Sequence, residues 1–211
     1  MTNNQFILKK ENGEIVENPE IDGLKIDFFG SNNLVEIEEG SVFKNTVLKL
    51  HDSCHVLINK TRPVGIRNLL VDMTGSRSGV LKIGGGISIG KATFAMANED
   101  APSIVIEEDC MISNDVVFRV TDGHPIYDKD SLIYLNPTKP IVIHKHVWIG
   151  HGAVLLKGTE ILPNSVIATR SVVTKKFTLS NIVVGGNPAK IIKKNINWDR
   201  AFERDAYKKY N

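Results

Sequence analysis

Residues 143–173 read IHKHVW IGHGAV LLKGTE ILPNSV IATRSV V when they are divided into blocks of six. An aliphatic side chain opens every block, and a small or β-branched residue stands two positions before each of the last five openings. The openings are Ile143, Ile149, Leu155, Ile161, Ile167 and Val173, and their companions are Val147, Ala153, Thr159, Ser165 and Ser171. A period of six fits neither an α-helix nor one alternating strand. It predicts a solenoid of short stacked coils.

The same period extends towards the N-terminus in a looser form. Ile37 and Phe43 are six residues apart, as are Ile83 and Ile89 in the glycine-rich LKIGGGISIG. Ile106, Ile112 and Phe118 resume the register. The three consecutive glycines are not followed by the Gly-Lys-Ser/Thr of a phosphate-binding loop, whereas glycine readily adopts the dihedral angles of tight turns. We therefore expect tight, stacked corners at this point.

The period fails over residues 120–140, VTDGHPIYDKDSLIYLNPTKP, which are rich in proline, aspartate and tyrosine. An insertion that leaves a regular solenoid is a typical place for function. The chain is therefore divided into N-terminal coils or a cap (1–33), an all-β parallel helix with the inserted loop (34–176) and a C-terminal segment (177–211). The final NWDRAFERDAYKKY predicts a short helix that caps the open end of the solenoid.

Composition narrows the class of protein. A hydrophobic content of 42% with 24% charged residues describes a folded chain, and a net charge of +2 gives no reason to expect nucleic acid or an anionic membrane as partner. We expect neither a signal peptide nor a membrane span, because no apolar run is long enough. Cys54 and Cys110 are the two cysteines, and Cys110 occupies a small-residue position of the repeat. A packing role and a cytoplasmic location are expected.

Two motifs that accompany the repeat are typical of a known family. Gly123-His124-Pro125 precedes Val147-Trp148-Ile149-Gly150, and VVGGNPAKII follows the last block. With the aliphatic-Gly-x-x-small-x blocks they resemble the hexapeptide-repeat acyltransferases, and most closely the sugar O-acetyltransferase branch of galactoside, maltose and capsule (polysialic acid) O-acetyltransferases. The resemblance covers Ile104–Lys193 well. It implies a left-handed parallel β-helix that works as a homotrimer.

The resemblance also implies a chemistry. Transfer of an acetyl group from acetyl-CoA to a hydroxyl requires a base for the hydroxyl proton, and histidine suits this role because its pKa lies near neutrality. Our hypothesis is that His124 is this base, at a cleft between two subunits. Asp122 or Asp128 is expected to fix its tautomer, and the sequence does not choose between them. The acceptor is expected to be a sugar or a capsular, sialic-acid-type polysaccharide.

By resemblance, Trp148 lies beside the histidine and positions the acetyl thioester. Backbone N–H groups near Trp148–Gly152 are candidates for the oxyanion site by their position alone. Contacts with CoA are expected at Trp148, His151, Thr169, Thr174, Lys175, Lys190 and Lys193. His151 replaces the usual small residue, and lysines replace the usual arginines, so the cations lose the bidentate fork. Acceptor contacts are expected from Asp122, Tyr127, Tyr134 and Asn98, and more weakly from Glu99 and Asp100.

Three rival interpretations remain. His144, His146 and His151 suggest a zinc site as in hexapeptide-repeat carbonic anhydrases. In that family two of the histidines are five residues apart, and the first follows the Ile-Gly of a block. Here the histidine after Ile-Gly is His151, and the residue five positions later is Leu156, so the pattern does not match. No metal is expected, and His144 and His146 are interpreted as exposed side chains. The second rival is a xenobiotic O-acetyltransferase of the same fold. The third is a β-helix scaffold without catalytic activity.

Overall fold

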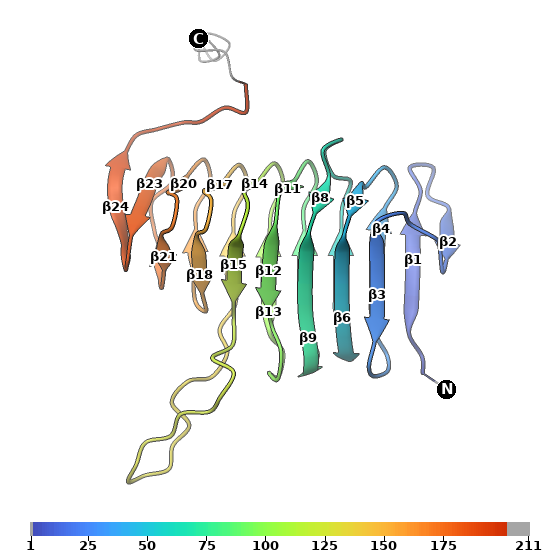
Figure 1. The fold of residues 1–211 in the computed structure, drawn as a ribbon, viewed down its shortest axis with the longest axis horizontal. Coiled ribbons are helices and arrows are strands. Elements are labelled where there is room, and N and C mark those ends of the chain that lie inside the picture. Colours follow the sequence, from blue (N-terminus) through green and yellow to red (C-terminus); the bar gives the residue numbers. More distant parts are fainter. Residues whose placement is uncertain (1, 202–211) are drawn as a thin grey trace.

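The computed structural model describes residues 2–201 as a long prism with three flat faces (Figure 1). The first face has nine strands, in the order β2 (Ile15–Glu17), β1 (Gln5–Lys9), β4 (Leu34–Glu38), β7 (His55–Ile58), β10 (Val80–Ile83), β13 (Ser103–Ile106), β16 (Ile141–Ile143), β19 (Glu160–Ile161) and β22 (Lys176–Phe177). The second has eight, β24 (Ala189–Lys194), β23 (Ile182–Gly186), β20 (Val166–Ile167), β17 (Trp148–Ile149), β14 (Met111–Ile112), β11 (Ser88–Ile89), β8 (Ile66–Arg67) and β5 (Phe43–Lys44). The third has seven, β21 (Val172–Val173), β18 (Val154–Leu156), β15 (Val116–Arg119), β12 (Ala92–Ala95), β9 (Leu69–Arg77), β6 (Thr46–Asp52) and β3 (Leu24–Phe28).

Each coil contributes one strand to each face in turn, so that β16, β17 and β18 form one complete coil and β19, β20 and β21 form the next. Neighbouring strands are parallel, apart from the pairs β1–β2 and β23–β24 at the two ends of the described chain. The architecture is the predicted all-β, left-handed parallel β-helix. We name its corners by the faces they join: first–second, second–third and third–first.

The strict repeat forms coils of constant length. Ile143 pairs with Ile161, Ile149 with Ile167 and Leu155 with Val173, so equivalent residues recur after three blocks of six. All six openings and all five companions are buried. Buried hydroxyl groups are satisfied locally, since Thr159 Oγ1 donates to Val173 O at 3.0 Å. The period of six is therefore one face and one corner of the prism.

Longer strands explain the looser N-terminal period. β6 has seven residues and β9 has nine, where β18 has three. Ile37 still pairs with Ile58, and Ile58 with Ile83, but these partners are further apart in sequence than one strict coil. Extra residues on the third face thus shift the repeat without disturbing the stack.

The glycine-rich stretch forms a tight corner, as predicted. A Cβ atom on Gly84 would lie 2.6 Å from the backbone of Glu107 and Glu108 in the next coil, and Gly86 has a φ of +68°. Cys110 is fully buried, and its Sγ lies 3.1 Å from the carbonyl oxygen of His144. Burial raises the pKa of this thiol to about 12, which agrees with a packing role.

The C-terminal segment differs from the prediction within the described chain. β23 and β24 form an antiparallel hairpin on the second face, and residues 195–201 then return over the coils (Figure 1). These returning residues are not helical, and residues 202–211 of the predicted terminal helix lie outside the described part. No helix that could span a membrane occurs in residues 2–201.

Candidate active site

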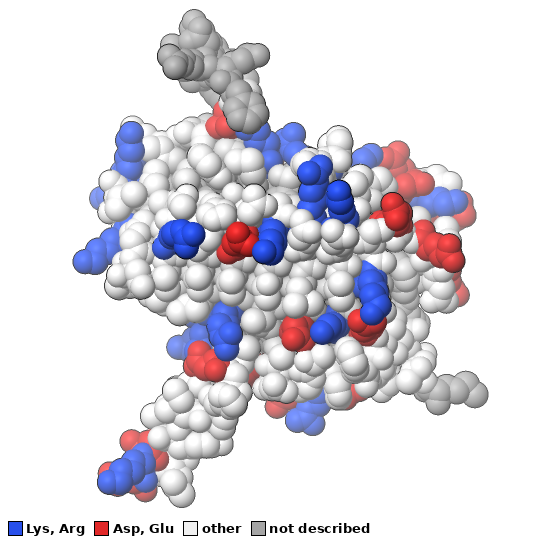
Figure 2. All heavy atoms as spheres, viewed as in Figure 1, with Lys and Arg blue, Asp and Glu red and all other residues white. Residues whose placement is uncertain are grey.

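The inserted loop leaves the prism at the third–first corner, between β15 and β16, and projects well beyond the coils (Figure 1). Its two arms pair with each other: Leu135 N donates to Ile126 O at 2.8 Å, and the rings of Tyr127 and Tyr134 have centroids 5.8 Å apart. Many of its large apolar side chains are exposed, namely Ile126, Tyr127, Leu132, Ile133, Tyr134 and Leu135. The charges of the loop gather at its tip and base (Figure 2). The arms therefore present apolar surface that their own chain does not cover.

His124 lies near the base of this loop, with an exposed side chain. Its backbone is held by Asn136 on the opposite arm. Asn136 Nδ2 donates to His124 O at 3.0 Å, and Asn136 Oδ1 accepts from Ile126 N at 2.6 Å. One amide side chain thus fixes the peptide groups on both sides of Pro125, which already restricts the backbone.

A partly buried lysine ties Asn136 to the prism. Lys157, at the corner after β18, donates to Asp122 Oδ2 at 2.5 Å and to Asn136 O at 2.7 Å, and only 17% of its side chain is exposed. Asn136 Nδ2 also donates to Asp122 Oδ2 at 2.9 Å. The hydrogen bond from Lys157, followed by that from Asn136, lowers the pKa of Asp122 below its usual value. These contacts anchor the base of the loop.

Neither candidate carboxylate contacts the imidazole of His124 in the described chain. Asp122 is engaged by Lys157 and Asn136, and Asp128 accepts hydrogen bonds from the backbone and hydroxyl of Ser131 at the loop tip. The backbone hydrogen bond from Ser131 is the largest cause that lowers the pKa of Asp128. Asp122 therefore supports the loop that carries His124, and Asp128 shapes its tip.

Trp148 opens β17 on the second face, after the first–second corner, and 39% of it is exposed. His124 emerges at the third–first corner of the preceding coil. The two predicted catalytic side chains therefore belong to different corners of the triangular cross-section. One chain does not bring them together.

The predicted CoA residues fall into separate groups. His151 and Thr169 lie at the second–third corner in successive coils, where Arg170 N donates to His151 O at 2.8 Å, and Lys190 on β24 pairs with Gly185 close to the same corner. Thr174 and Lys175 lie at the third–first corner, and Lys193 lies further along β24. The first group alone forms a continuous strip along one edge of one chain.

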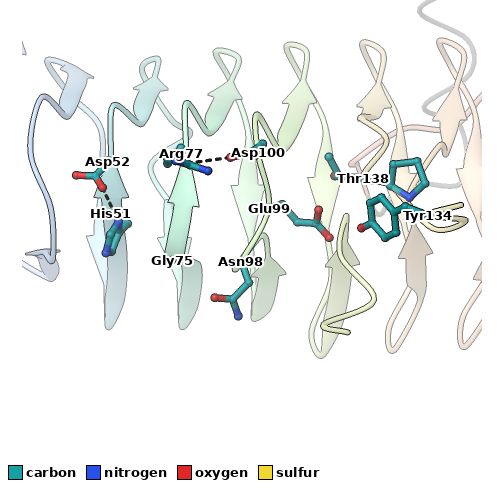
Figure 3. Close-up of a pocket in the computed structure, with 10 residues that line it drawn as sticks. His51, Asp52, Gly75, Arg77, Asn98, Glu99, Asp100, Tyr134 and Thr138 are labelled. Carbon is teal, nitrogen blue, oxygen red and sulfur yellow. Dashed lines mark hydrogen bonds and ion pairs between the residues drawn. The ribbon is translucent and has the colours of Figure 1, made fainter. Parts of the chain in front are cut away.

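A polar cavity of about 550 Å³ opens beside the loop base (Figure 3). It brings together two predicted acceptor residues, Asn98 from the β12–β13 connection and Tyr134 from the loop. Glu99 and Asp100, the weaker candidates, also line it. Its other walls stand in no motif of the sequence and were not predicted; they are His51, Asp52, Gly75, Arg77, Pro137 and Thr138. Tyr127 and Asp122 are outside this lining.

The cavity walls come from successive coils stacked along one corner, which Figure 3 shows as a row ending at Tyr134 and Thr138. Arg77 Nε lies 3.1 Å from Asp100 Oδ1, so its charge is partly matched within the wall. Thr138 Oγ1 donates to Val120 O at 2.8 Å and closes the loop base. No local motif could have revealed this cavity, because it depends on which coils stack.

His144 and His146 are not the exposed side chains that the sequence suggested. His144 lies between Glu107 Oε1 and Glu160 Oε1, at 3.1 Å from each. His146 Nδ1 lies 2.7 Å from Asp109 Oδ2. Both rings are partly buried and bridge neighbouring elements. In residues 2–201, no three His, Cys, Asp or Glu side chains form a group that could hold a metal ion.

The repeat and the fold are both similar to those of known proteins. Residues 140–175 match the profile of the family described as bacterial transferase hexapeptide (six repeats). The repeat in these residues is therefore of the hexapeptide type. The solved structure of the polySia-specific acetyltransferase NeuO superposes with a TM-score of 0.73 and 28% identity, and covers 90% of this chain and 88% of that one.

Curated relatives match about three fifths of the chain. The polysialic acid O-acetyltransferase of Escherichia coli O1:K1 / APEC is 37% identical over 129 residues, which are 61% of this chain and 41% of the relative. The galactoside O-acetyltransferase of Escherichia coli (strain K12) is 33% identical over 131 residues, 59% of this chain and 62% of the relative. The chain therefore spans less than two thirds of the length of either relative.

Proposed function

We propose that the chain is an O-acetyltransferase that transfers an acetyl group from acetyl-CoA to a hydroxyl of a sugar. The observation that carries this proposal is His124, whose backbone is held by hydrogen bonds at the base of a projecting loop. The same loop contributes Tyr134, Pro137 and Thr138 to a polar cavity. The O-acetyltransferases among the similar proteins support it. We further propose a cytoplasmic homotrimer that acts on a free or polymeric sugar.

In this mechanism His124 takes the proton from the acceptor hydroxyl as the oxygen attacks the thioester carbonyl. The C–S bond then breaks, the CoA thiolate receives the proton from the imidazolium, and the products are an acetyl ester and CoA. Backbone N–H groups near Trp148–Gly152 would stabilise the oxyanion. The cavity with Asn98 and Tyr134 would hold the acceptor, since its polar walls suit a polyhydroxyl molecule.

The separation of His124 and Trp148 supports a shared site. Because the loop projects from one corner and Trp148 lies on another face, each site would combine the loop of one copy with the second face of its neighbour. The uncovered apolar side chains of the loop would then be buried against that neighbour. CoA would lie along the strip with His151, Thr169 and Lys190, and lysine would pair with its phosphates as a point charge.

Binding of CoA tests the proposal against a scaffold. We expect CoA at a hundredfold excess over its dissociation constant to stabilise the folded protein by about 2.7 kcal/mol, measured as a concentration-dependent rise in melting temperature. Adenosine at the same concentration is the control ligand. Absence of any shift at saturating CoA would favour the scaffold. Turnover with neutral sugars, sialic acid oligomers and antibiotic alcohols would then identify the acceptor, and exclusive use of the last would favour the xenobiotic enzyme.

Asn136 provides a second test. Replacing Asn136 with Leu removes both hydrogen bonds that flank Pro125, so His124 is no longer held in one position. We expect kcat to fall about tenfold or more, because small displacements of a catalytic group are costly. Ser131→Ala is the matched control, since it removes a side-chain hydrogen bond at the loop tip. Equal kcat values for the two variants would show that the Asn136 contacts do not position His124.

A further inference from the structure

The C-terminal strap, residues 195–201, docks onto the first–second corner beside Trp148. Figure 1 shows it leaving β24 and passing back over the coils. Asn181 holds its first part, because Asn181 Nδ2 donates to Ile196 O at 2.9 Å. Trp198, which is only 7% exposed, is the centre of the docked part. An aromatic side chain buried in an otherwise irregular segment indicates a specific contact.

Trp198 contacts both the ring and the backbone of His146. The two rings stack, with centroids 4.2 Å apart and an angle of 13° between their planes. Trp198 Nε1 donates to His146 O at 2.9 Å, and His146 Nε2 lies 3.1 Å from Trp198 O. Since His146 Nδ1 also lies 2.7 Å from Asp109 Oδ2, the imidazole itself is fixed. These contacts therefore hold the strap at one corner residue, His146.

Arg200 fastens the far side of the strap. Its guanidinium donates to Asp109 Oδ1 at 3.2 Å, to Ser88 Oγ at 2.9 Å and to Cys110 O at 2.8 Å. Only 17% of its side chain is exposed. Its carbon Cζ also lies 5.5 Å from the ring centre of Trp198, a cation–π arrangement. Arg200 thus joins the strap to two neighbouring coils, and Trp198 joins it to a third through His146.

Trp148 borders this assembly. Its ring centroid is 6.1 Å from that of Trp198, and the two planes are inclined at 45°, within the range of favourable aromatic pairs. Trp148 lies at the outer surface of a strand and keeps 39% of its area exposed. The remaining freedom of its side chain is limited on one side by Trp198. The strap therefore borders one side of the exposed Trp148 ring.

We infer that Trp198 is a positioning residue for Trp148, and that the strap, docked through His146 and Arg200, completes the thioester side of the active site. This inference rests on the proposed role of Trp148 in binding acetyl-CoA. Trp198 acts through the orientation of the neighbouring indole, because a tilted aromatic contact selects among side-chain rotamers. The expected consequence is weaker binding of acetyl-CoA when the strap is undocked.

The experiment compares Trp198→Ala with Trp198→Phe. Trp148 and Trp198 are the two tryptophans of the sequence, so Trp148 is the sole indole emitter in both variants. We expect Trp198→Ala to raise KM for acetyl-CoA about three- to tenfold and to increase acrylamide quenching of Trp148, because one aromatic contact is lost. Trp198→Phe, which keeps an aromatic ring, is expected to stay within about twofold of the parent in KM.

Two histidine variants separate docking from general damage to the corner. His144→Asn and His146→Asn each remove an imidazole that contacts a carboxylate, but only His146 contacts the strap. Asparagine tolerates the positive φ of His146, which is 54°. We expect a raised KM for His146→Asn and for Arg200→Gln, and a parental KM for His144→Asn. These variants keep the test available if Trp198→Ala fails to fold.

The outcomes distinguish this inference from the proposed function. Parental KM values for Trp198→Ala, His146→Asn and Arg200→Gln, with Trp148 newly accessible to acrylamide, would overturn the positioning role. A fully active Trp148→Ala enzyme would overturn the proposed role of Trp148 itself. A raised KM in the strap variants with unchanged His144→Asn supports the inference.

Discussion

His124→Ala is expected to lower kcat for acetyl transfer by about 100- to 10,000-fold, the range typical for loss of a general base. The variant should keep the melting temperature of the parent, because the His124 side chain is exposed and makes no hydrogen bond in the described chain. Steady-state assays with acetyl-CoA and the best sugar acceptor, with circular dichroism as a check of folding, measure both effects. A loss of rate without a loss of stability is the signature of a catalytic group.

Lys129→Ala is the control for this prediction, since it removes an exposed side chain from the tip of the same loop and should leave kcat unchanged. A folded His124→Ala variant that turned over at the parental rate would contradict the proposed mechanism. Mixing inactive His124→Ala and Trp148→Ala subunits extends the test. If each site uses two chains, some sites in mixed trimers carry both residues intact, and part of the activity should return.

The fold was predictable wherever each strand has two or three residues. In the strict coils, from β16 to β21, every corner and strand together take six residues, so the period appears directly in the sequence. In the N-terminal coils, β6 and β9 are longer, and the spacing between stacked partners varies. The side chains still point inwards at alternate positions along each strand. Because the coils differ in length, however, the spacing between stacked residues is not constant and the repeat is hard to see in the sequence.

The candidate site was predictable only where its residues stand in a short motif. His124 and Trp148 stand in such motifs, whereas Asn136, Lys157 and Trp198 gain their roles from contacts across many residues. These contacts depend on how far the loop and the strap travel before they return to the prism. Asn136 and Lys157 resemble ordinary polar residues in sequence, and burial or hydrogen bonding reveals them.

Phe118→Ala is expected to destabilise the protein by about 3–5 kcal/mol, the usual cost of removing a buried phenylalanine ring. Phe118 is fully buried on β15, and its ring centroid lies 4.5 Å from that of Phe94 in the adjacent coil, at an angle of 60°. The coils above and below are fixed by their backbone ladders, so they cannot collapse into the space that the ring leaves. The free energy of unfolding from urea titrations measures this loss.

Phe29→Ala is the matched control, because the same ring is removed from a side chain that is 58% exposed, and the expected loss is below about 1 kcal/mol. Phe118 also stands two residues before Val120, where Thr138 closes the loop base. We therefore expect hydrogen exchange at the loop base to quicken in Phe118→Ala and to remain parental in Phe29→Ala. Similar destabilisation by both substitutions would contradict the view that the stacked core beneath β15 supports the loop carrying His124.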